Sequence, residues 1–250
     1  PPRSTLFPYT TLFRSIIGIG EGENYIGSDI AAMLEHTRSV IILDEGELAV
    51  LTDDRVELFD QAGNAVAKQP FYVHWNVENV VKTGFEHYML KEIFDQPDAF
   101  RRMLSEYMPS GDDTELNVSL PAPARLQKIH LVACGTAYHA ALVGKYVLEK
   151  MLRIPAEAEI ASEFRYRDPV LNEHTLVIAV SQSGETADTL AAIREAKSQG
   201  APVLAITNVV GSTMTREADA VLYTHAGPEI SVASTKAYTT QLIMVYLLSI

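Results

Sequence analysis

Hydroxyl side chains crowd one short stretch that directly follows an apolar run. Residues 176–180 read LVIAV, and the next six are Ser181-Gln182-Ser183-Gly184-Glu185-Thr186. A helical pattern begins immediately afterwards, in ADTLAAIREAKSQG. A helix N-terminus presents unpaired N–H groups and partial positive charge, and hydroxyls and an amide add donors beside it. These residue types at this spacing therefore predict a phosphate-binding loop.

Two other interpretations of this loop are a P-loop and ordinary helix capping. The loop has no lysine, so it does not match a P-loop, and a nucleoside triphosphate with magnesium is not implied. Ordinary helix capping is the alternative, because Ser and Thr are frequent N-caps without any ligand. One cap uses one hydroxyl, whereas Ser181, Ser183 and Thr186 provide three. We therefore favour the phosphate.

The elements around this loop alternate between strand and helix from residue 126 onward. Strands are expected at 128–133, 175–180, 202–207 and 220–224, and residues 156–164 are expected to begin as a short strand that leads into another helix. Such alternation predicts a parallel sheet covered on both faces, and hence a doubly wound fold of flavodoxin-like or Rossmann-like order. No G-x-G-x-x-G follows any of these strands, so a dinucleotide site has no support. A second loop of small residues, Cys134-Gly135-Thr136, follows the first strand.

The first half of the chain has a different pattern of predicted secondary structure. Turn residues at 44–46, 53–54 and 62–64 separate short apolar or alternating runs, which predicts an antiparallel meander. Residues 84–108 have helical spacing, with Pro97 expected to kink or restart the helix. Residues 109–125 are rich in Pro, Gly and acidic residues and are expected to form a linker. The first fifteen residues, PPRSTLFPYTTLFRS, resemble a translated sequencing adapter, and the chain stops at Ile250 within an apolar helical pattern. We expect a fragment.

Composition excludes several classes of protein. The 250 residues are 47% hydrophobic and 21% charged, the balance of an ordinary soluble domain. The net charge of -12 disfavours nucleic acid as a partner. The single cysteine excludes an intramolecular disulfide and fits a reducing compartment. No apolar run approaches the roughly 18 residues that a membrane helix needs. We expect a soluble, cytoplasmic protein.

Several motifs together resemble one enzyme family. SQSGETADT, ACGTAY, EIASEFRYR and EISVASTKAYTTQ are similar to the first sugar isomerase (SIS) domain of glucosamine-6-phosphate synthases, the isomerizing glutamine–fructose-6-phosphate aminotransferases. IIGIGEGENYIGSDIAAMLEHTR, LDEGELAVLT and HYMLKEIFDQP resemble the end of the family's glutaminase domain and its connecting helix.

The resemblance implies a domain organisation. It assigns residues 1–15 to a non-native segment, 16–87 to the C-terminal part of a type-2 glutaminase domain, 88–125 to a helical connector and linker, and 126–250 to a truncated first SIS domain. The expected fold class is α/β. A flavodoxin-like doubly wound parallel sheet would follow an α+β remnant of the N-terminal-nucleophile glutaminase domain.

The resemblance also implies chemistry and partners. The family converts fructose 6-phosphate and glutamine into glucosamine 6-phosphate, the first step of amino-sugar and UDP-N-acetylglucosamine synthesis, as a cytoplasmic homodimer without metal or organic cofactor. The residues that match its sugar-phosphate site are Thr136, Ala137, Ser181, Gln182, Ser183, Thr186, Val232 and Ser234. Ala137 departs from the family, which often has serine there. The catalytic groups belong to a second SIS domain, a C-terminal tail and an N-terminal cysteine, so no catalytic residue is expected here, and the chain alone is expected to turn over neither substrate.

Other interpretations remain open. One is a non-catalytic sugar-phosphate-binding SIS regulator, although the acidic, strand-rich first half lacks the basic helix-turn-helix that a regulator would carry. The other is a purely structural fragment. Among single residues, Cys134 is expected to be a small buried hydrophobe. Lys236 is expected to be either structural or a local charge near the ligand, rather than a Schiff-base lysine. The seven histidines show no metal-ligand spacing.

Overall fold

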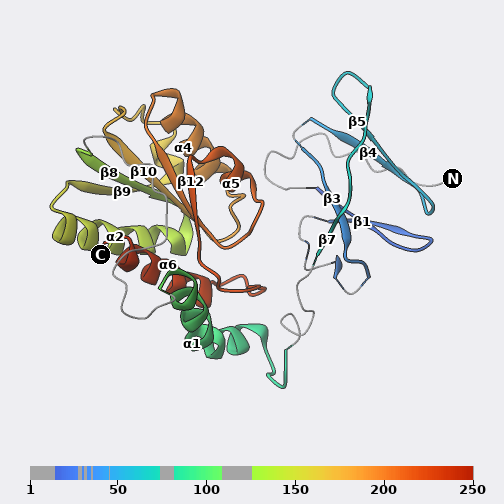
Figure 1. Ribbon diagram of the computed structural model, residues 1–250, viewed down its shortest axis with the longest axis horizontal. Coiled ribbons are helices and arrows are strands. Elements are labelled where there is room, and N and C mark those ends of the chain that lie inside the picture. The colour runs from blue at the N-terminus through green and yellow to red at the C-terminus, as the bar shows by residue number, and fades with distance from the viewer. Residues whose placement is uncertain are drawn as a thin grey trace. The chain divides into compact units, whose positions relative to one another are not determined.

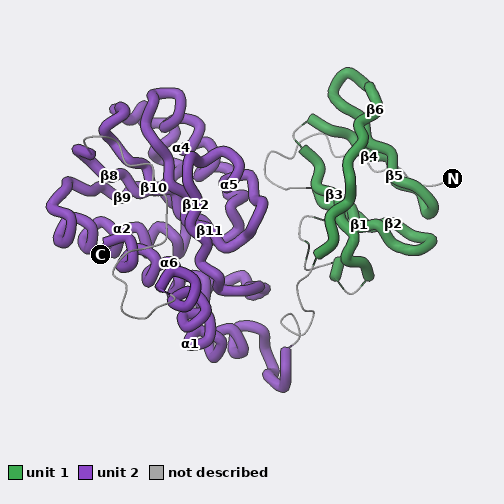
Figure 2. Tube along the Cα trace, in the orientation of Figure 1, with its two compact units in different colours: residues 1–81 green, residues 82–250 purple. Residues whose placement is uncertain are grey.

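The structure of the chain is a computed structural model. It describes residues 15–27, 30, 33–34, 36–44, 46–73, 82–108 and 126–249. Almost all of the expected adapter segment and the expected linker at 109–125 lie outside the described residues. So do parts of residues 27–37, GSDIAAMLEHT, in which Ser28 or Asp29 as an N-cap predicts a short helix. The chain divides into two compact units, residues 1–81 and 82–250 (Figure 2).

The first unit is built from antiparallel strands, as the turn residues predict. Its strands are β1 (Ile16–Ile19), β2 (Asn24–Gly27), β3 (Ser39–Ile42), β4 (Leu48–Leu51), β5 (Val56–Phe59), β6 (Ala65–Val66) and β7 (Phe71–Tyr72). They form a four-stranded sheet in the order β2-β1-β3-β7 and a three-stranded sheet in the order β4-β5-β6. Ile17 of β1 and Ile41 of β3 pack against Leu58 of β5, which joins the two sheets. The meander prediction is confirmed for β4, β5 and β6. It is wrong for β3, which pairs with β1 and β7, so that the turn at 44–46 connects two sheets.

The second unit contains a parallel sheet between two layers of helices (Figure 1). Its strands are β8 (Lys128–Ala133), β9 (Ala156–Ile160), β10 (Thr175–Ser181), β11 (Val203–Thr207) and β12 (Ala220–Tyr223). Its helices are α1 (Tyr88–Tyr107), α2 (Gly135–Leu152), α3 (Ala161–Phe164), α4 (Ala187–Ser198), α5 (Thr213–Glu217) and α6 (Lys236–Leu247). The strand order is β12-β11-β10-β8-β9, which is the flavodoxin-like order. The predicted fold class is confirmed.

The sheet is buried on both faces, which explains why its strands read as continuous apolar runs. Leu131 of β8 and Ile178 of β10 face a core shared with α1, α2 and α6. Val132 and Val177, one residue out of phase, face a second core shared with α3, α4 and α5. Alternate side chains along each strand therefore pack into the two cores on opposite faces of the sheet.

Helix α1 continues through Pro97, so the restart that was one of the two outcomes predicted there does not occur. Proline cannot donate the hydrogen bond that the carbonyl of Ile93 would otherwise accept. The side-chain amide of Gln96 donates to that carbonyl instead, at 3.0 Å. The lost backbone bond is therefore replaced within the same turn. No helix among the described residues is long and apolar enough to cross a membrane.

A buried histidine makes the second unit sensitive to acid. His130 of β8 is fully buried; its Nε2 lies 3.2 Å from Glu159 Oε2, and its Nδ1 has no hydrogen-bond partner. Burial, the main cause, lowers the pKa of His130, and the charge of Lys128 adds to this effect, while Glu157 and Glu159 oppose it. Protonation of His130 is therefore less favourable in the folded chain than in the unfolded chain.

We expect this difference to reduce stability as the pH falls. Because the folded pKa of His130 lies below the ordinary value of 6.5, its contribution is intact above that pH and is lost progressively below it. His130→Gln should flatten the pH dependence of the free energy of unfolding between about pH 7 and about pH 5. Urea melts of both forms across that range measure the slopes, and equal slopes would contradict the assignment.

Candidate functional site

The two hydroxyl-bearing loops leave neighbouring strands at the same edge of the sheet. Ala133 at the end of β8 pairs with Val180 of β10, so Cys134 and Ser181 begin the loops at the same level. From β8 the chain continues to β9 on one side, and from β10 it continues to β11 on the other. Ligands of doubly wound sheets bind at such a switch point, outside the carboxyl ends of the strands.

The loop after β10 is shaped by its own hydroxyls. The Ser181 side chain is buried, and its Oγ accepts the N–H of Gly184 at 3.1 Å and lies 3.0 Å from Thr186 Oγ1. Ser183 Oγ accepts the N–H of Glu185 at 3.2 Å. A hydroxyl has one proton to donate besides its acceptor sites. The half-buried Ser183 therefore keeps its proton for a further acceptor, whereas Ser181 mainly braces the turn.

Helix α4 begins without a side-chain cap. Thr186 occupies the N-cap position, but its side chain makes no capping hydrogen bond. The capping interpretation of this threonine is therefore not realised. The acidic residue of the first turn, Asp188, accepts a hydrogen bond from Arg165 at 3.0 Å, which offsets its negative charge beside the loop.

The position of the Glu185 carboxylate in a loop that is expected to bind phosphate is explained by its hydrogen bonds. Glu185 Oε1 accepts the N–H of Thr213 at 2.8 Å, at the start of α5. The carbonyl of Gly184 accepts the N–H of Met214 at 3.1 Å. The fully buried Ser212 lies directly behind Gly184, and its hydroxyl has no hydrogen-bond partner. The loop is thus held against the start of α5, and the Glu185 carboxylate takes part in this contact.

Asn208 joins this loop to the chain beyond β12. Its backbone N–H donates to the Gln182 carbonyl at 3.1 Å, and its Nδ2 donates to the Gly227 carbonyl at 2.8 Å. Its Oδ1 accepts the Thr224 hydroxyl at 3.1 Å and the Ala226 N–H at 2.9 Å. Sequence reasoning missed this residue. The signal was present, since Asn208 directly follows the strand beside β10 at the ligand-binding edge.

The loop after β8 is short and enters α2 at once. Thr136 lies in the first turn of α2 with its side chain exposed, and Ala137 is buried beneath it. Cys134 is the N-cap residue, is half-buried and makes no side-chain capping bond. Of these residues, Thr136 is the one whose hydroxyl is open to a ligand.

Val232 and Ser234 lie on a separate segment between β12 and α6. The Val232 side chain is fully exposed, and the Ser234 hydroxyl donates to Glu229 Oε2 at 2.8 Å. The other oxygen of Glu229 accepts the N–H groups of Thr235 at 2.8 Å and Ala237 at 3.2 Å, and so caps α6. This segment reaches the loop after β10 through the bonds of Asn208 rather than through a strand pair.

Lys236 is structural. It is 2% exposed, and its Nζ donates to Asp95 Oδ2 of α1 at 2.9 Å. No group of three or more His, Cys, Asp or Glu side chains that could hold a metal ion occurs among the described residues.

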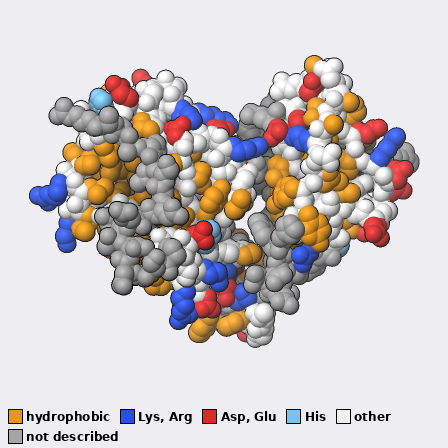
Figure 3. All heavy atoms as spheres, in the orientation of Figure 1, with side chains coloured by type: hydrophobic (Ala, Val, Ile, Leu, Met, Phe, Trp, Pro, Cys, Tyr) orange, Lys and Arg blue, Asp and Glu red, His pale blue; other side chains and the backbone are white. Residues whose placement is uncertain are grey.

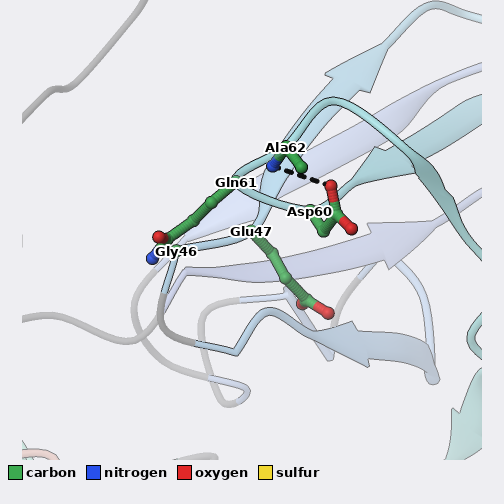
Figure 4. Close-up of a pocket in the computed structure, with 5 residues that line it drawn as sticks. All are labelled: Gly46, Glu47, Asp60, Gln61 and Ala62. Atoms are coloured by element: carbon green, nitrogen blue, oxygen red, sulfur yellow. Dashed lines mark hydrogen bonds between the residues drawn. The ribbon is translucent and has the colours of Figure 1, made fainter.

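A shallow cavity of about 300 Å³ lies in the first unit (Figure 4). Its lining residues come from two turns and are Gly46, Glu47, Asp60, Gln61 and Ala62. Asp60 Oδ1 accepts the Ala62 N–H at 2.8 Å, and Glu47 is paired with Lys68. These polar groups serve the turns themselves, so the cavity is not the candidate site.

Comparisons with known proteins agree with the fold and the motifs. The SIS domain family matches residues 124–250, about half of the chain, and the chain belongs to this family. The sequence is 52% identical over 238 residues to the glutamine–fructose-6-phosphate aminotransferase [isomerizing] of Clostridium tetani and 54% identical over 238 residues to that of Caldanaerobacter subterraneus subsp. tengcongensis. Each alignment covers 94% of this chain and 39% of the relative, so the chain spans well under half the length of these relatives.

One solved structure supports the same relationship. The C-terminal domain of glucosamine-fructose-6-phosphate aminotransferase from Francisella tularensis superposes with a TM-score of 0.63 and 42% identity. The match covers 68% of this chain and 48% of that one. The resemblance inferred from the motifs is confirmed.

Proposed function

We propose that the second unit binds fructose 6-phosphate at the switch point between β8 and β10. The observation that carries this proposal is the pair of hydroxyl loops at that edge, one of which leads into the uncapped N-terminus of α4. Oriented N–H groups and hydroxyls in such a place favour a phosphate dianion even on a chain of net charge -12.

Within this proposal the residues have separate roles. Ser183, Thr186 and the Gln182 side chain donate to the phosphate, and Ser181 fixes the loop. Thr136 contacts the sugar near the phosphate, above the small Ala137. Val232 and Ser234 line the sugar. These assignments rest on the local geometry described above and on the motifs shared with the family.

For the whole protein we propose the activity for which its relatives are named. It would transfer the amide nitrogen of glutamine to fructose 6-phosphate and release glucosamine 6-phosphate, as a cytoplasmic homodimer without cofactor. Residues 16–87 would then derive from the glutaminase domain, 88–125 from the connector, and 126–250 from the first SIS domain. The antiparallel sheets of the first unit support this division.

Binding by the chain itself is the direct test. At about 100 times its Kd, a ligand stabilises a folded protein by about 2.7 kcal/mol. Fructose 6-phosphate should therefore raise the melting temperature of the chain, and fructose at the same concentration should not. Calorimetric titration gives the affinity. If fructose 6-phosphate neither binds nor stabilises the chain, the proposal is overturned and the purely structural interpretation stands.

A further inference from the structure

Helix α1 reaches into the segment that carries Val232 and Ser234. Glu92 of α1 is 2% exposed, and its Oε1 accepts the N–H of Ile230 at 2.6 Å and the N–H of Ser231 at 3.2 Å. A buried carboxylate is costly unless donors compensate its charge. Here Oε1 alone has donors, and they are backbone groups of the 229–234 segment, while Oε2 is buried without a hydrogen-bond partner. The position of that segment is therefore tied to α1.

The same helix is fixed to α6 directly beside this contact. Asp95 Oδ2 accepts Lys91 Nζ at 2.8 Å and Lys236 Nζ at 2.9 Å, and Gln96 accepts the Thr239 hydroxyl. Burial alone would raise the pKa of Asp95, but the hydrogen bonds and charges of the two lysines together outweigh it and hold that pKa below its usual value. Asp95 is thus charged at neutral pH, and α1 cannot slide along α6 without separating it from Lys236.

Two more contacts extend this attachment. Arg102 donates to the Ala226 carbonyl at 3.3 Å. The Tyr107 hydroxyl donates to the Tyr223 carbonyl at 2.9 Å and accepts the Tyr223 N–H at 2.8 Å, which covers the edge of β12. Side chains of α1 therefore hold the chain at intervals from the end of β12 to the second turn of α6. In Figure 3, charged and apolar side chains lie intermixed over α1.

We propose that Glu92 is a positioning residue for the sugar half of the binding site. This inference rests on the proposed function. The loop after β10 is braced by α5 and by Asn208, which also bonds the chain at residues 224–227. The 229–234 segment that follows is held by Glu92 and Glu229, so its direct contacts differ from those of the loop after β10. Glu92 lies outside residues 124–250, which match the SIS family, so the connector helix supplies part of the site that the family alone does not.

If this proposal is right, removing the Glu92 carboxylate lowers the affinity for one ligand and not for another. Without Glu92 the 229–234 segment adopts its binding arrangement only part of the time, and the apparent affinity is multiplied by the fraction of time that it does. If the fraction is about one tenth, Glu92→Ala weakens fructose 6-phosphate binding about tenfold. Inorganic phosphate contacts only the loop after β10, so its affinity should stay unchanged. Glu92→Gln keeps an oxygen acceptor and should restore most of the affinity for fructose 6-phosphate.

Calorimetric titration of the chain and its variants with fructose 6-phosphate and with inorganic phosphate tests this. Tyr107→Phe is the matched control, because it removes a different contact of α1 and leaves the 229–234 segment untouched. It should lower the free energy of unfolding without changing either affinity.

Three results would overturn the inference while the proposed function survives. The first is unchanged fructose 6-phosphate affinity in Glu92→Ala. The second is an equal loss of affinity in Tyr107→Phe, and the third is an equal loss for both ligands in Glu92→Ala; either of these would indicate general destabilisation. If Glu92→Ala does not fold, Glu92→Gln is the deciding variant. A roughly tenfold loss of fructose 6-phosphate affinity in Glu92→Gln would contradict the proposal that a hydrogen-bond acceptor at this position holds the 229–234 segment. Failure of the unmodified chain to bind fructose 6-phosphate would overturn the proposed function and this inference with it.

Discussion

Ser183→Ala is expected to weaken fructose 6-phosphate binding by roughly ten- to a hundredfold. The Ser183 oxygen already accepts the N–H of Glu185, so its proton is the part of the group that remains to donate. A hydrogen bond to a charged partner contributes about 1.5 to 3 kcal/mol, which corresponds to that loss of affinity. Inorganic phosphate should lose affinity as well, in contrast to its expected behaviour with Glu92→Ala.

The effect on folding separates ligand binding from capping. If Ser183 served only the local turn, its removal would cost about 1 kcal/mol of stability and leave affinity unchanged. Ser198→Ala is a matched control, because Ser198 lies at the opposite end of α4 and bonds only the Glu195 carbonyl of its own turn. Calorimetric titration and urea melts of the three forms measure both quantities. Equal affinity in the unmodified chain and Ser183→Ala would remove this serine from the site.

The alternation of elements in the second unit could be predicted because local and global signals agree there. The strands around Val132 and Val177 are buried on both faces, so they read as apolar runs, and glycines or hydroxyls end them. Strand order is fixed by crossover handedness and by the pattern of connections, which leaves few alternatives. The strand order in turn predicts which loops lie at the carboxyl edge of the sheet. The residue types alone identify the hydroxyl-rich loop after β10 among them.

The role of α1 could not be predicted from its periodicity. Apolar residues at 89, 90, 93 and 94 have helical spacing, yet all four side chains are exposed, from 40% for Leu90 to 64% for Phe94. The buried face carries Glu92 and, further along, Ala99 and Met103. An acidic residue at helical spacing ordinarily indicates a solvated face. Only its partners, more than a hundred residues away in the chain, reverse that expectation.

Polar partners, some distant in the chain and some local, account for the other misses. The sequence contains no cue that the Glu185 carboxylate turns toward Thr213. Nor does it show that Gln96 replaces the bond lost at Pro97, because that depends on one rotamer. Asn208 differs, since its place after a parallel strand was a usable signal. Hydrophobic pattern therefore predicts the layers, and hydrogen bonds between distant residues decide how the loops are held.

Gly184→Ala is expected to abolish measurable fructose 6-phosphate binding, with an affinity loss above roughly a hundredfold, and to destabilise the second unit. Gly184 has φ +66°, and a Cβ atom there would lie 2.2 Å from Ser212 Oγ and 2.9 Å from Thr207 Oγ1. The left-handed conformation costs a non-glycine residue about 1 to 2 kcal/mol, and overpacking adds about 1 to 3 kcal/mol. The loop can relieve the clash only by moving away from α5, which would displace Ser183 and Thr186 from the phosphate.

Gly200→Ala isolates the conformational part of that effect. Gly200 has φ +78° just after α4, and a Cβ atom there would meet nothing within 4 Å. It should therefore cost about 1 kcal/mol of stability and leave fructose 6-phosphate affinity unchanged. Combining Gly184→Ala with Ser212→Gly removes the nearest obstacle and should recover part of the lost affinity, because the crowding, unlike the φ angle, depends on Ser212. Titration and urea melts of the four forms distinguish these contributions. If Gly184→Ala bound fructose 6-phosphate as tightly as Gly200→Ala, close packing of the loop against α5 would have no part in holding the phosphate.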